Sequence, residues 1–150
     1  MRLLMAGRGE KGPKFIKFWF PVILYSGIIF LVSSIPDVQT PLGDDYFDKI
    51  LHLLIYSPFG FLLTRAFLSG FGTGQGSPPL KAGRVFSERG VSMAVAFCAL
   101  LYGISDEYHQ SFVPGRNVSP WDVLADTLGG WVGAYIYFFL MKKTQNTLSR

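Results

Sequence analysis

Four apolar segments separated by polar connections constrain the fold of this chain more than any other feature. The first two run from Phe18 to Ser33 and from Ile50 to Leu68, and they approach the ~20 apolar residues that a helix needs to cross a bilayer. The third and fourth, Val91 to Ile104 and Leu128 to Met141, are too short to cross alone. Both must continue into polar turns, so we expect an all-α membrane protein with four transmembrane helices.

The composition favours a membrane protein over a soluble one. Hydrophobic residues make up 49% of the 150 residues and charged residues only 16%. The net charge of +4 does not indicate a nucleic-acid partner, because the basic residues alternate with apolar segments and form no stripe. Cys98 is the single cysteine, which excludes an intrachain disulfide and a metal site built on a cysteine pair.

The distribution of charge predicts how the chain crosses the membrane. Residues 1–17, 69–89 and 142–150 are rich in Lys and Arg, and by the positive-inside rule they face the cytoplasm. Residues 35–47 carry acids but no Lys or Arg, which suits the outer face. We expect cytoplasmic basic segments at both termini around a membrane domain over 18–141 that contains a Gly/Ser/Pro-rich cytoplasmic loop. A cleaved signal peptide is the alternative for the first span, but no small-x-small cleavage pattern follows it.

The connection between the third and fourth helices is predicted to be a tight outer hairpin. The third helix must continue to Gln110 to reach membrane length. Ser119 before Pro120 supplies an N-cap and a proline at the first helical position, which together signal a helix start. We therefore expect a turn over residues 111–119 and a fourth membrane span that runs to about Met141.

The second helix carries polar residues along one face. Asp48, His52 and Tyr56 follow one another at steps of four, with Lys49 beside them. Structural roles would explain each of them: a capping Asp, a snorkelling Lys, an interfacial Tyr and a hydrogen-bonded core His. The functional alternative is proton transfer by His52, because an imidazole titrates near neutral pH.

Carboxylates gather on both sides of the hairpin. Asp122 lies in the first turn of its helix, where the dipole favours an acid whatever the function. Asp106 and Glu107 close a helix, where exposed carbonyls disfavour a carboxylate, so they need another explanation. Asp126 lies one turn deeper, and the small-residue pattern over Ala125–Gly133 predicts that this face packs closely against another helix.

Arg116 lies in the hairpin turn and is the only Arg expected on the outer side. Its planar guanidinium suits bidentate contact with an anionic ligand, and pairing with an internal acid is the alternative.

No metal site and no cofactor are predicted. The ligand types would permit one, but no local spacing supports it, and the sequence has no phosphate-binding loop, nucleophile elbow or zincin motif. The residues that such a site would draw on are His52, His109, Asp106, Glu107 and Asp126.

These motifs together resemble those of the VanZ-like family, bacterial membrane proteins named for a teicoplanin-resistance component. The matching residues are Asp48-Lys49-x-x-His52-x-x-x-Tyr56, then Asp106-Glu107-x-x-Gln110-x-Phe112-x-Pro114-Gly115-Arg116-x-x-Ser119-x-x-Asp122, then Gly129 and Gly133. The resemblance covers roughly residues 22–137 and departs at Asp126, where family members more often show Asn. It implies a multi-pass protein of the bacterial plasma membrane that affects glycopeptide susceptibility, and it implies no particular reaction.

We expect an outward-facing polar pocket that binds an anionic or lipid-linked envelope component, with Arg116 in contact with the anion. A membrane-embedded enzyme that uses His52, Asp106 and Glu107 as acid or base groups is the second hypothesis, and a small proton-coupled transporter is the third. Membrane lipids are the expected partners, and the sequence leaves a homo-oligomer open. The residues expected to bind the substrate are Asp48, Lys49, His52, Tyr56, Asp106, Glu107, Gln110, Arg116, Asp122 and Asp126.

Overall fold

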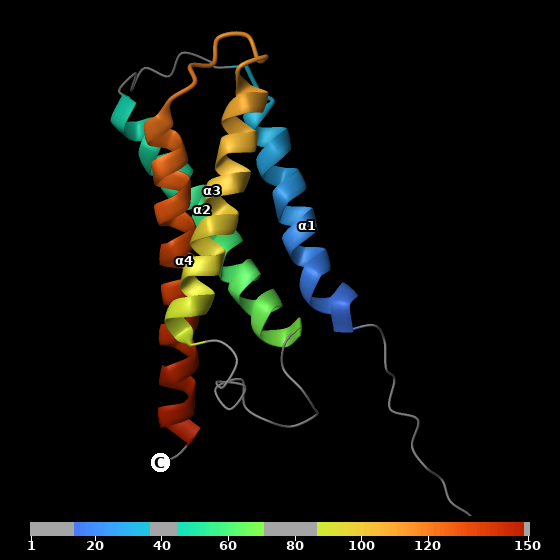
Figure 1. Cartoon of the computed structure of the whole chain (residues 1–150), viewed down its shortest axis with the longest axis vertical. Coiled ribbons are helices and arrows are strands. Elements are labelled where there is room, and N and C mark those ends of the chain that lie inside the picture. The colour runs from blue at the N-terminus through green and yellow to red at the C-terminus, as the bar shows by residue number, and fades with distance from the viewer. Residues whose placement is uncertain (1–13, 37–44, 71–86, 149–150) are drawn as a thin grey trace, which may run out of the picture.

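The computed structural model describes residues 14–36, 45–70 and 87–148, and within them it contains four helices and no strand. The helices are α1 (Lys14–Ser33), α2 (Asp45–Gly70), α3 (Glu88–Gln110) and α4 (Pro120–Leu148) (Figure 1). Each of the four is long and apolar enough to cross a membrane. The predicted all-α fold with four transmembrane helices is confirmed, and the chain is a multi-pass membrane protein.

The helices run alternately in opposite directions. The start of α1 and the end of α4 lie at one end of the bundle, and the α3–α4 turn lies at the other (Figure 1). α2 packs most extensively against α4, α3 also packs on α4, and α1 joins the bundle mainly through α2. The predictions for the basic N-terminal segment, the acidic outer connection and the Gly/Ser/Pro-rich loop fall largely on residues 1–13, 37–44 and 71–86, which lie outside the described residues.

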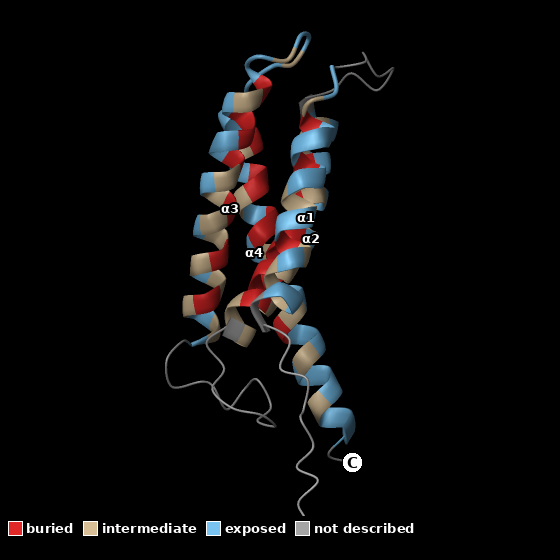
Figure 2. Cartoon of the chain, turned by 90° about the vertical axis from the view of Figure 1, so that its right-hand side faces the viewer, coloured by how far each residue is buried: buried red, intermediate tan, exposed pale blue. Residues whose placement is uncertain are grey.

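Large apolar side chains cover the outside of the bundle, and acids are among the residues buried inside it. Buried residues follow the inner faces of the helices and exposed residues cover the outer faces (Figure 2). Large apolar side chains such as Ile23, Leu31 and Phe97 are exposed, whereas Asp106 and Asp126 are buried. An apolar outer surface of this extent requires a lipid environment.

Glycines on α4 allow α2 and α3 to approach its backbone closely. A Cβ at Gly129 would lie 2.6 Å from the carbonyl oxygen of Leu53, and a Cβ at Gly133 would overlap the carbonyl oxygen of Ser57. Gly130 meets α3 in the same way, because a Cβ there would lie 2.5 Å from the Cβ of Ala99. The predicted close packing of the small-residue face of α4 is therefore observed, and it fixes the register between α2 and α4.

α4 continues to Leu148, so the helix extends beyond the predicted membrane span that runs to about Met141. No Gly or Pro follows Met141 to stop the helix, and Lys and Gln favour helical backbone. The extension also brings the ammonium of Lys142 to 2.8 Å from a carboxylate oxygen of Glu88 at the start of α3. The basic segment over 142–150 therefore begins as helix.

The sidedness of the bundle stays a prediction, with the α3–α4 turn outside and both termini in the cytoplasm. In a Cys98→Ala background, we expect Asn117→Cys in the turn to react with a membrane-impermeant thiol reagent in intact cells. Thr147→Cys, at the exposed end of α4, should react only after the cells are permeabilised. Labelling of the second position alone in intact cells would reverse the topology.

Candidate functional site

Charged and polar side chains converge between α2, α3 and α4 near the end of the bundle that carries the α3–α4 turn. They are buried or half-buried, and contacts link α2 to both of the other helices. We call them the polar cluster, and its members are Asp48, Lys49, His52, Tyr56, Asp106, Glu107, Gln110, Asp122 and Asp126.

A buried contact between His52 and Asp126 lies at the centre of the polar cluster. Nδ1 of His52 is 2.9 Å from Oδ1 of Asp126, and neither side chain is more than 9% exposed. The carboxylate fits there because Gly103 on α3 has no side chain, and a Cβ at that position would lie 2.7 Å from Oδ2 of Asp126. An ionised Asp126 can only accept a hydrogen bond, which makes Nδ1 the donor and leaves Nε2 of a neutral imidazole with its lone pair.

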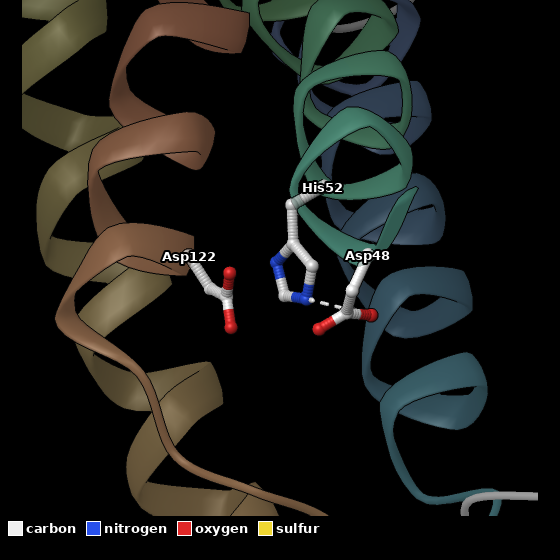
Figure 3. A group of neighbouring side chains, drawn as sticks. All are labelled: Asp48, His52 and Asp122. Carbon is white, nitrogen blue, oxygen red and sulfur yellow. Dashed lines mark ion pairs between the residues drawn. The ribbon is translucent and has the colours of Figure 1, made fainter. Parts of the chain in front are cut away.

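Asp122, Lys49 and Asp48 lie one helical turn nearer the α3–α4 turn than this contact. Nζ of Lys49 is 3.3 Å from Oδ1 of the buried Asp122, which forms an ion pair between α2 and α4. Nε2 of His52 is 4.0 Å from Oδ1 of Asp48, whose side chain is 43% exposed. Asp48 and Asp122 face the imidazole of His52 from opposite sides (Figure 3).

Glu107 joins the end of α3 to the start of α4. Its Oε2 accepts a hydrogen bond of 2.8 Å from the backbone N–H of Ser119, the residue before α4. The Ser119 hydroxyl in turn accepts a bond of 3.3 Å from the N–H of Trp121, which confirms the predicted N-cap. The carboxylate that seemed misplaced at the C-terminal end of α3 therefore satisfies an amide at the N-terminal end of α4.

Asp106 is held by one side chain from its own helix and one from α2. Nε2 of Gln110 donates a hydrogen bond of 3.3 Å to Oδ2 of Asp106, and the Tyr56 hydroxyl lies at 3.5 Å from the same oxygen. Both contacts are long for hydrogen bonds, so they stabilise the buried carboxylate of Asp106 only weakly.

The polar cluster contains more negative charge than its own cations balance. One oxygen each of Asp106, Glu107 and Asp126 is buried without a hydrogen-bond partner among the described residues. Of the basic side chains described at this end of the bundle, only Lys49 forms an ion pair with an acid of the polar cluster, apart from His52. An uncompensated buried carboxylate is costly, so the buried acids are suited to a cation or a hydrogen-bond donor, whereas an anionic group can be met by the partly exposed Lys49.

Arg116 lies outside these contacts and binds the end of α1. Its Nε donates a hydrogen bond of 3.1 Å to the carbonyl of Ile35, and Nη2 lies 3.4 Å from the carbonyl oxygen of Val32. A helix leaves its last carbonyls without intrahelical partners, and a cation is favoured there. His109 contacts the same region, through a bond of 2.9 Å between its Nε2 and the hydroxyl of Ser34, the residue after α1. Sequence patterns do not reveal these roles, because the acceptors are mainly backbone groups.

Replacing Arg116 is therefore expected to loosen α1. Arg116→Ala removes two hydrogen bonds made by a charged group, which contribute roughly 1.5–3 kcal/mol each when well formed. We expect Arg116→Ala to lower the thermal stability in detergent, and Arg116→Lys to recover part of the loss because a cation remains at the helix end. Unchanged melting of Arg116→Ala would show that these contacts contribute little.

The fold and the polar cluster define a class: a four-helix membrane protein whose buried acids lie between helices at one end of the bundle. The family profile described as VanZ/LLP1 matches residues 10–141, and the chain belongs to this family. Neither a search of curated proteins nor a search of solved structures gave a match.

Proposed function

We propose that this VanZ-like protein resides in the bacterial plasma membrane, binds an anionic or lipid-linked envelope component at the polar cluster, and thereby affects susceptibility to glycopeptides such as teicoplanin. The observation that carries the proposal is the convergence of buried charged side chains from α2, α3 and α4, in which Lys49 supplies a partly exposed cation. Such a cluster costs stability in a membrane bundle, and ionisable groups within membrane segments usually mark a functional site.

The depth of the polar cluster supports a ligand that is anchored in the membrane. Tyr46, Tyr108, Phe112 and Trp121 are all more than 60% exposed and belong to the same end of the bundle. Tyr and Trp, which make up three of these four residues, are enriched at the lipid headgroup level. The cluster would therefore lie where the headgroup of a lipid-linked compound is presented.

Lys49 is the group best placed to meet an anionic headgroup. Its side chain is 28% exposed, and it belongs to the polar cluster, whereas Arg116 uses two of its donor groups on carbonyls of the α1 end. The sequence-based proposal that Arg116 contacts the anion is therefore modified, and Lys49 is the proposed first contact.

Binding can be tested with a polyprenyl phosphate titrated into protein held in nanodiscs of zwitterionic lipid, with tryptophan fluorescence as the signal. Lys49→Gln should weaken binding about tenfold or more, because a hydrogen bond between charged groups is lost. Lys142→Gln is the matched control, since Lys142 pairs with Glu88 at the other end of the bundle. If the wild type, Lys49→Gln and Lys142→Gln all fold and bind with equal affinity, the anion does not bind at Lys49.

The phenotype is tested by expression in a teicoplanin-sensitive bacterial host. We expect the wild type and Lys142→Gln to change the teicoplanin concentration that inhibits growth, and Lys49→Gln to have a smaller effect at equal expression. No change with the wild type would contradict the role in glycopeptide susceptibility.

A membrane-embedded enzyme is the second candidate function, and the contact between His52 and Asp126 favours it. A buried carboxylate on Nδ1 orients an imidazole and stabilises its charged form, as in general acid–base catalysis. Nε2 then faces the partly exposed Asp48, where a ligand can approach. Turnover of the bound compound by the wild type and its loss in His52→Gln would favour the enzyme over the simple binding protein.

A further inference from the structure

Three side chains of the polar cluster form a set of metal-ligand atoms that joins α2 to α4. A carboxylate oxygen of Asp48, a ring nitrogen of His52 and a carboxylate oxygen of Asp122 all lie within 4.8 Å of one another (Figure 3). We propose that these three side chains bind a divalent transition-metal cation, for which Zn²⁺ is the reference ion.

The separations require only a small adjustment of the side chains. Bonds from Zn²⁺ to oxygen or imidazole nitrogen are about 2.0–2.2 Å long, so ligand atoms around one ion lie roughly 3–4 Å apart. Asp48 is the partly exposed member and can rotate inward, whereas His52 and Asp122 are held by the close crossing of α2 and α4. The helix register therefore fixes two ligands and leaves one adjustable.

Asp126 supplies the supporting contact that a metal-binding histidine needs. Such a histidine usually donates its other ring N–H to a carboxylate, which fixes the tautomer and the ring orientation. Nδ1 of His52 is 2.9 Å from Oδ1 of Asp126, and Nε2 is the nitrogen that faces Asp48. The imidazole is thus oriented with its free nitrogen toward Asp48.

Buried carboxylate oxygens without a hydrogen bond give an independent reason to expect a cation. Asp122 is 1% exposed, and its Oδ1 has no hydrogen bond among the described residues, although Lys49 lies 3.3 Å away. Oε1 of Glu107 is buried and also lacks a partner there, while the other oxygen binds the amide at the start of α4, one turn before Asp122. A divalent ion would neutralise two carboxylates in surroundings of low dielectric constant, and Lys49 would compete with it for Asp122.

The donor set selects the class of cation. Two carboxylate oxygens and an imidazole nitrogen suit Zn²⁺ or Mn²⁺, whereas Mg²⁺ and Ca²⁺ prefer oxygen ligands alone. A bound cation would also attract an anionic headgroup; that role rests on the proposed function, but binding of the cation itself does not.

The test is titration of Zn²⁺ into the full chain, purified in detergent without a polyhistidine tag, with calorimetry and elemental analysis of the dialysed protein. We expect stoichiometric binding by the wild type and a loss of affinity of about tenfold or more in His52→Gln and Asp48→Asn. Asp126→Ala should weaken binding by roughly 10–100-fold through the supporting contact. Lys49→Gln should tighten binding, because the competing ammonium is removed.

His109→Gln is the matched control, because the other histidine of the chain contacts Ser34 and stacks on Phe30 of α1. Helical content and melting temperature are measured for every variant. If His52→Gln does not fold, Asp48→Asn still tests the site, because the Asp48 side chain is partly exposed. Absence of Zn²⁺ binding by the wild type, or equal binding by wild type, His52→Gln and Asp48→Asn, would overturn the proposal. If the wild type binds polyprenyl phosphate but not Zn²⁺, the cation site is contradicted and the proposed function is not. If it binds Zn²⁺ but not polyprenyl phosphate, the proposed function is contradicted and the cation site is not.

Discussion

Gly133→Ala is expected to destabilise the bundle by about 3 kcal/mol, at the upper end of the usual range for overpacked sites. A Cβ at this position would overlap the carbonyl oxygen of Ser57 and lie 2.7 Å from the backbone nitrogen of Phe61. Both are backbone atoms of α2, so they cannot be displaced by rotating a side chain. α2 and α4 would have to separate, and the polar cluster between them would lose its register.

The change is measured by thermal unfolding in detergent, with Gly27→Ala as the matched control. Gly27 lies on α1, and a Cβ there meets nothing within 4 Å. Alanine is favoured over glycine inside a helix by roughly 1 kcal/mol, so the control should melt at the same temperature as the wild type or slightly higher. Equal melting of Gly133→Ala and Gly27→Ala would contradict the close crossing of α2 and α4.

Local sequence patterns were sufficient to predict the helices and the N-cap of α4. The apolar segments gave the four spans, and Ser119 with Pro120 gave the start of α4, because both signals depend on neighbouring residues. The small residues before and after Gly129 also predicted which face of α4 approaches another helix. These features follow from helical periodicity alone.

The partners of individual side chains could not be predicted in the same way. Glu107 binds the amide of Ser119, and Arg116 binds carbonyls near the end of α1. These partners could not be predicted because every residue has the same backbone amide and carbonyl groups, whatever its side chain. The approach of His52 to Asp122 depends on the register between α2 and α4. That register is set by contacts of glycines on α4 with the backbone of α2, which lies far away in the sequence. Sequence spacing therefore identified the residues of the polar cluster but not which of them are neighbours.

Asp126→Ala is expected to be the most damaging single change within the polar cluster. It removes the acceptor of the His52 Nδ1–H and leaves an imidazole only 9% exposed without that partner. Removing one member of a buried charged pair costs roughly 3–5 kcal/mol, and an unsatisfied neutral group costs roughly 1–3 kcal/mol. The size of the loss in thermal or chemical unfolding therefore reports whether His52 is charged in the folded protein.

Asp126→Asn separates the hydrogen bond from the charge. An asparagine Oδ1 can still accept from Nδ1 of His52, and the variant removes a carboxylate whose Oδ2 is buried without a partner among the described residues. We expect its stability to be close to that of the wild type, and Asp126→Ala to be much less stable than both. If Asn is as damaging as Ala, the negative charge of Asp126 is what holds His52, and the pair acts as an ion pair. If Ala is as stable as the wild type, the contact between His52 and Asp126 does not orient the imidazole, and its supporting role in the polar cluster is lost.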